Sequence, residues 1–131
     1  MHVLIDTCVW SQALRRTDKN NEHARELSEI ISDNRACIIG PIRQEILSGV
    51  SIKQHFQSLR DHLSAFPDLL IKTIDYETAA NYFNLLRGKG IQGSTVDFLI
   101  CAVAYRYDML IYTLDNDFKY FSKYIPIKLY S

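Results

Sequence analysis

Short apolar runs recur along the chain, separated by longer and more polar segments. Runs of this length, with apolar residues at successive positions, are typical of strands buried on both faces of a sheet. We therefore predict strands at Val3–Ile5, Ala36–Ile39, Leu69–Ile74, Met109–Tyr112 and Ile127–Leu129.

The segments between these runs repeat apolar residues at the spacing of a helix. They predict helices over Glu22–Asp33, from Gly40 and Pro41 onward, over Ile52–Phe66, from Asp75 to Gly88, and over Thr95–Tyr107. Asn20 or Asn21 is expected to cap the first of these, and Asp75 the fourth. The last is apolar on more than one side, so we expect it to be largely buried.

Strands that alternate with helices predict an α/β fold, in which a parallel sheet of four to five strands is covered on both faces. The 131 residues suit a single domain over 1–131, with no repeat and no linker rich in proline or glycine. No apolar run is long enough for a membrane span, so we expect no membrane association. The three cysteines form no CxxC pair, which favours buried free thiols and a cytoplasmic protein.

Acidic residues follow the predicted strands or begin the helices after them. Asp6 directly follows the first strand, Glu45 lies early in the helix after the second, and Asp97 lies in the first turn of the buried helix. Asp115 and Asp117 follow the run that ends at Tyr112. Strand carboxyl ends and the amino ends of the following helices share one edge of a parallel sheet, so we expect these acids to converge there.

Converging carboxylates without nearby lysine or arginine partners repel one another, and a divalent cation removes that repulsion. Mg²⁺ and Mn²⁺ prefer hard oxygen ligands. A metal held in this way activates a water molecule and offsets charge on a phosphodiester. The pattern therefore favours metal-dependent phosphodiester hydrolysis.

Each acid also has a structural interpretation. Ser94 and Asp97 have the spacing of a capping box, in which the aspartate would only cap its helix. Glu45 could be a solvated helix residue, and Asp115 and Asp117 could only form a turn. Asp6 is the least easily explained in this way, because it lies in an apolar stretch.

The chain resembles the PIN-domain family, and within it the VapC-like toxins of bacterial and archaeal toxin–antitoxin pairs. Four segments carry the resemblance in order along nearly the whole chain: Val3–Trp10, Arg43–Gly49, Ser94–Ala104 and Tyr112–Phe118. Two departures lie beside the acids: Cys8 stands where a small polar residue is common, and residues 93–95 differ from those of many relatives. Neither removes an acid.

This resemblance implies an α/β/α sandwich, Mg²⁺- or Mn²⁺-dependent endoribonuclease activity on RNA, a homodimer, and a cognate antitoxin that blocks the site. By position it assigns catalytic and metal-site roles to Asp6, Glu45, Asp97 and Asp115, with Asp117 as a possible further ligand. Thr7 and Thr113 match hydroxyl positions that orient a carboxylate or a water molecule.

The main alternative is a catalytically silent PIN-fold module that binds RNA or protein. The presence of all four acids argues against this alternative. A phosphotransfer enzyme is less favoured, because the first strand lacks the paired acids such sites use. The net charge of zero, from 15 basic and 15 acidic residues, neither supports nor excludes RNA binding. Basic residues that could contact phosphates beside the acids are Arg15, Arg16, Lys19, Arg87, Lys89, Lys119 and Lys123.

Overall fold

The computed structural model of the chain describes residues 1–15 and 21–131. Its four strands are β1 (Val3–Ile5), β2 (Ala36–Cys37), β3 (Leu110–Tyr112) and β4 (Lys128–Leu129). They form one sheet in the order β2-β1-β3-β4, and every neighbouring pair is parallel. The predicted parallel sheet is therefore confirmed, with four strands among the described residues.

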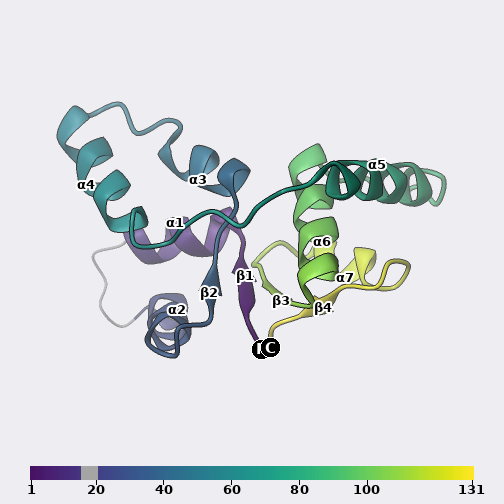
Figure 1. Cartoon of the computed structure of the whole chain (residues 1–131), viewed down its shortest axis with the longest axis horizontal. Coiled ribbons are helices and arrows are strands. Elements are labelled where there is room, and N and C mark those ends of the chain that lie inside the picture. The colour runs from purple at the N-terminus through teal and green to yellow at the C-terminus, as the bar shows by residue number, and fades with distance from the viewer. Residues whose placement is uncertain (16–20) are drawn as a thin grey trace.

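Helices cover both sides of this sheet, as the sequence predicts. On one side lie α1 (Thr7–Arg15), α2 (Glu22–Ser32), α3 (Gly40–Leu47) and α4 (Lys53–Leu63) (Figure 1). On the other lie α5 (Thr73–Arg87), α6 (Thr95–Tyr107) and the short α7 (Asp117–Phe121) (Figure 1). None of these described helices is long and apolar enough to cross a membrane.

The core lies between the sheet and the two helical layers. All of β1 is buried, and α6 is buried without interruption from Phe98 to Ala104. This confirms the expectation that a helix apolar on several sides is enclosed by the rest of the protein. The cysteines are free thiols, as predicted, but only Cys101 is fully buried, while Cys8 and Cys37 are half-buried.

One predicted strand, Leu69–Ile74, is wrong. Its first residues cross from α4 to α5 as an irregular segment, and α5 already begins at Thr73. The carbonyl of Leu70 accepts hydrogen bonds from the side chains of Arg106 and Tyr107. The N–H of Leu69 still donates to the backbone carbonyl of Ile38 at 2.9 Å, but side chains of α6 bind the next carbonyl, which a local apolar pattern cannot reveal.

Other boundaries differ by a few residues. β2 ends at Cys37, and Ile38 forms only an isolated bridge with Asp68. Asn21 caps α2 as predicted, while the alternative cap, Asn20, lies outside the described residues. Asp75 is not the cap of α5 but its third residue, where its carboxylate accepts a hydrogen bond from the backbone N–H of the cap, Lys72.

Candidate metal centre

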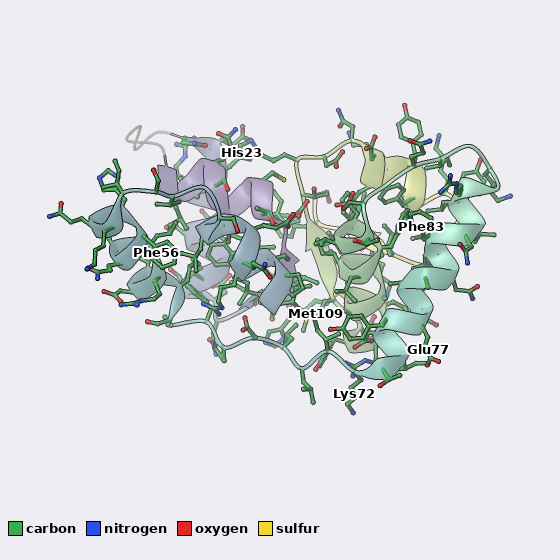
Figure 2. All side chains as sticks on the ribbon, turned by 90° about the horizontal axis from the view of Figure 1, so that it is seen from above. His23, Phe56, Lys72, Glu77, Phe83 and Met109 are labelled. Carbon is green, nitrogen blue, oxygen red and sulfur yellow. The ribbon has the colours of Figure 1, made fainter. Side chains whose placement is uncertain are left out.

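The predicted acids all belong to the carboxyl edge of the sheet. Asp6 follows β1, Asp115 follows β3, Asp97 is in the first turn of α6, and Glu45 is in the second turn of α3. This edge lies at the upper ends of β1 and β2 in Figure 1, and it is seen from above in Figure 2. The chain topology therefore brings together residues that lie far apart in the sequence.

Asp6 is the most constrained of the acids. It is only 7% exposed, and its Oδ1 accepts a hydrogen bond from the backbone N–H of Thr7 at 2.8 Å. Its Oδ2 accepts a second bond from the hydroxyl of Thr113 at 2.7 Å. Because these donors come from the ends of β1 and β3, the carboxylate is held between the two central strands.

Cys8 contributes a contact that sequence reasoning missed. Its thiol donates to Oδ2 of Asp6 at 3.6 Å, and its sulfur accepts the backbone N–H of Leu114 at 3.3 Å. Burial raises the pKa of this thiol, and the charge of Asp6 raises it further, so the thiol stays protonated and able to donate. The only sequence signal was its position two residues after Asp6.

Glu45 joins the site through a hydroxyl group. The Thr7 side chain donates a hydrogen bond to Oε1 of Glu45 at 2.8 Å, which ties α3 to the first turn of α1. Glu45 is exposed and lines an open hollow of about 560 Å³, together with Thr7, Ser11 and Val96. The predicted role of Thr7 and Thr113 as hydroxyl groups that orient carboxylates is thus confirmed by their hydrogen bonds.

Asp97 caps its own helix, as the structural interpretation of the sequence anticipates. Its backbone N–H donates to Oγ of Ser94, and its Oδ2 accepts the backbone N–H of Ser94, both at 3.0 Å. Within the described part of the chain, its Oδ1 has no hydrogen-bond donor. Capping therefore leaves one oxygen free, so it does not exclude a ligand role.

The electrostatics of Asp97 show that three of the acids interact. Burial raises the pKa of the Asp97 carboxyl above its ordinary value, although hydrogen bonds from Ser94 lower it in part. The negative charges of Asp6 and Asp115 raise this pKa further. Such mutual repulsion is what a bound cation would relieve.

Asp115 and Asp117 differ in their exposure to solvent. Asp115 is half-buried, and its Oδ1 accepts the backbone N–H of Asp117 at 2.9 Å, so the turn anticipated from the sequence is present. Asp117 is exposed at the start of α7. The structure thus places Asp115, rather than Asp117, beside Asp6 and Asp97.

The chemistry of these donors fits a hard divalent cation. All the acids offer carboxylate oxygens, and the four ion pairs among the described residues involve other acids, namely Asp61, Asp68, Asp75 and Asp108. In the described residues, however, no three histidine, cysteine or acidic side chains lie close enough together to hold a metal ion as placed. The site therefore has the right ligand type without a closed ligand cage, which accords with Mg²⁺ keeping several water ligands.

The sequence profile of the PIN domain matches residues 3–124, which includes every acid described above. The chain belongs to the PIN-domain family. Comparison with curated protein sequences gave no match. The α/β/α arrangement expected from the four sequence segments is thereby confirmed for this PIN domain.

Solved structures share this fold at low sequence identity. VapBC2 from Rickettsia felis, bound to a DNA fragment from its promoter, superposes with a TM-score of 0.78 at 19% identity, covering 99% of this chain and 98% of the other. FitAcB from Neisseria gonorrhoeae gives a TM-score of 0.78 at 16% identity, covering 98% and 96%. A toxin–antitoxin complex from Klebsiella pneumoniae gives 0.65 at 19% identity, covering 87% of each chain.

Proposed function

We propose that this PIN domain is a Mg²⁺- or Mn²⁺-dependent endoribonuclease, with Asp6, Glu45, Asp97 and Asp115 as its catalytic and metal-binding acids. The observation that carries the proposal is that the charges of Asp6 and Asp115 both act on the carboxyl of Asp97, while no described ion pair involves any of the three. A bound cation would relieve the repulsion between unpaired carboxylates placed in this way.

The residues of the chain have distinct parts in this proposal. Asp6, held by donors from two strands, supplies a rigid anchor, and Asp97 supplies the oxygen that its capping box leaves free. Glu45 stands at the open hollow, where a water molecule can approach, and the exposed Asp117 is available as an additional ligand. When bound, the metal would activate water and stabilise charge on the phosphodiester.

The test is RNA cleavage by Asp6→Asn and Asp97→Asn variants in the presence of Mg²⁺ or Mn²⁺. Both changes remove a charge and keep the side-chain shape, and the amide oxygen introduced by Asp97→Asn can still accept the N–H of Ser94. Asp61→Asn is the matched control, because Asp61 is exposed on α4, away from this edge. We expect both site variants to lose cleavage and the control to retain it.

If both folded site variants cut RNA as fast as the parent, the proposal is wrong. If the parent binds Mn²⁺ but cuts no RNA, the proposal is also wrong, and the fold would instead serve as a catalytically silent module that binds RNA or protein. Circular dichroism of each variant establishes that it is folded.

We further propose that the protein is the toxin of a toxin–antitoxin pair, acts in the cytoplasm as a homodimer, and is blocked by a cognate antitoxin protein. The support is its likeness in fold to a toxin–antitoxin complex and to VapBC2 bound to promoter DNA. Induced expression should arrest growth, Asp6→Asn should not, and co-expression of a small protein encoded beside it should restore growth. Light scattering measures the oligomeric state. Normal growth during expression of the soluble parent would contradict the toxin role.

A further inference from the structure

Two segments of the chain carry positive charge and no acidic residue. Residues 78–96 contain Arg87 and Lys89, and residues 118–131 contain Lys119, Lys123 and Lys128. In a chain whose net charge is zero, such segregation leaves part of the surface basic if the two segments meet.

The structure brings these segments together beside α7. The Lys89 ammonium lies 4.8 Å from the centre of the Tyr124 ring, which joins the loop after α5 to the segment after α7. Beneath this contact, the rings of Phe98 and Phe121 pack with their centres 4.9 Å apart. Lys123 lies 5.2 Å from the centre of the Tyr120 ring. We call Lys89, Lys119, Tyr120, Lys123 and Tyr124 the basic–aromatic surface.

The charges of this surface are not neutralised by neighbouring acids. The ion pairs of the described residues use Arg43, Arg60, Arg106 and Lys128 as their cations, and none uses Lys89, Lys119 or Lys123. The tyrosines are exposed as well, Tyr120 by 53% and Tyr124 by 46%. Large aromatic side chains left exposed beside cations that have no acidic partner indicate a binding surface rather than a packed one.

This surface continues from the candidate metal centre. Lys119 and Asp115 line the same hollow of about 360 Å³, which also includes Asn116 and Tyr130. α7 begins at Asp117, so its lysine and tyrosine follow the acids within one turn. In Figure 2, α7 lies near Phe83, at the end of the molecule opposite Phe56 on α4.

We propose that the basic–aromatic surface binds the single-stranded RNA that flanks the bond to be cut, with phosphates at the lysines and bases stacked on the two tyrosines. Combining cations with exposed aromatic rings suits single strands, because only unstacked bases offer a face to a tyrosine. An acidic protein segment would pair with the lysines but would not need the exposed tyrosine rings. This inference rests on the proposed nuclease function, because it takes RNA as the substrate.

The experiment measures RNA binding separately from cleavage. Fluorescence anisotropy of a labelled 12-nucleotide single-stranded RNA is followed in EDTA, with the parent, Lys89→Ala/Lys123→Ala and Tyr120→Leu/Tyr124→Leu. Lys53→Ala on α4 and Tyr105→Leu are matched controls, since Lys53 and Tyr105 are also exposed but belong to other elements. A labelled oligoglutamate peptide is the competing probe.

We expect the lysine variant to reduce the slope of log affinity against log salt by about 1.4, or about 0.7 for each lost phosphate contact. The tyrosine variant should weaken RNA binding by about tenfold per stacked base, with its salt slope unchanged. Both controls should bind RNA as the parent does.

The inference is overturned if the parent binds no single-stranded RNA, or if both surface variants bind it as the parent does. Oligoglutamate that binds as tightly as RNA, with tyrosine changes having no effect, would also overturn it in favour of an acidic protein partner. Loss of RNA binding in the surface variants of a parent that cuts no RNA would support RNA binding at this surface and reject only the nuclease proposal. The two failures are thereby distinguishable.

Discussion

The hydroxyl group of Thr113 donates a hydrogen bond to Oδ2 of Asp6 at 2.7 Å, and this bond links the ends of the two central strands, β3 and β1. The same hydroxyl oxygen accepts the backbone N–H of Asp115 at 3.0 Å. One side chain thus orients two of the three acids that interact, so the geometry of the site depends on a residue that carries no charge.

Replacing Thr113 by valine removes this hydroxyl group and keeps the side-chain shape. We expect Mn²⁺ affinity, measured by titration calorimetry, to fall by about 10- to 100-fold, the usual cost of losing a group that orients a metal ligand. Thr113→Ser keeps the hydroxyl and should restore most of the affinity. Equal affinity in the valine variant and the parent would show that Thr113 does not position the ligands.

Metal removal should lower the stability of the parent, because a cation at the proposed site would offset the repulsion that Asp6 and Asp115 exert on Asp97. At a Mn²⁺ concentration about 100 times its Kd, the free energy of unfolding should rise by about 2.7 kcal/mol over its value in EDTA. Thermal melting measures this gain. Asp97→Asn should lose most of it and Asp61→Asn none, and an equal gain in all three proteins would place the metal elsewhere.

The buried Asp75 forms an ion pair with the half-buried Arg106, which fastens α5 to α6. Hydrogen bonds from Arg106 hold the pKa of the Asp75 carboxyl below its ordinary value, and this side chain is only 1% exposed. Asp75→Asn should reduce the free energy of unfolding by about 2–3 kcal/mol at pH 7, because it removes the negative charge that pairs with Arg106.

The pH dependence of this pair has a defined sign. A depressed pKa in the folded state stabilises the protein above the pKa of the unfolded chain, about 3.9, and that contribution is lost as the pH falls through the folded value. The stability difference between parent and Asp75→Asn should therefore be constant near neutral pH and shrink below about pH 4. Denaturant unfolding across this range measures it, and a difference that grows in acid would contradict it.

Gly93 allows a close approach of two rings beneath the loop before α6. A Cβ atom at this position would lie 2.7 Å from Cζ of Phe121 and 2.9 Å from Cζ of Phe98, so one of the rings would have to move. Gly93→Ala should lower the free energy of unfolding by about 1–3 kcal/mol.

Gly88→Ala is the matched control for Gly93→Ala. At Gly88 the backbone is right-handed, and the added Cβ would meet backbone oxygens at 3.4 and 3.5 Å, which is ordinary contact. Its stability should change by less than about 1 kcal/mol in the same denaturant titration. Equal losses in both variants would mean that the Phe98–Phe121 contact is not the cause.

Much of the fold follows from local patterns in the sequence. Val3–Ile5 and Thr95–Tyr107 are apolar in ways that only a buried strand and a buried helix accommodate, and both are observed. Leu69–Ile74 was predicted as a strand on the same basis and is not one. The N–H of Leu69 bonds to the backbone after β2, and side chains from α6 bind the carbonyl of Leu70. This run is not buried either, since Leu70 is 65% and Ile74 is 53% exposed. A short apolar run by itself therefore predicts neither burial nor a strand.

The sequence by itself determined at which edge of the sheet the acids lie, because strands of a parallel sheet end at a common edge whatever the loops between them do. Only the tertiary structure decided how they meet: Asp97 uses one oxygen to cap α6, Thr113 holds Asp6, and Asp115 lies further inside than Asp117. It also decided that Lys89 lies over Tyr124. The physical reason is that long or strongly apolar elements such as β1 and α6 can be recognised from local periodicity, whereas hydrogen bonds and ring contacts depend on side chains that approach from distant parts of the chain.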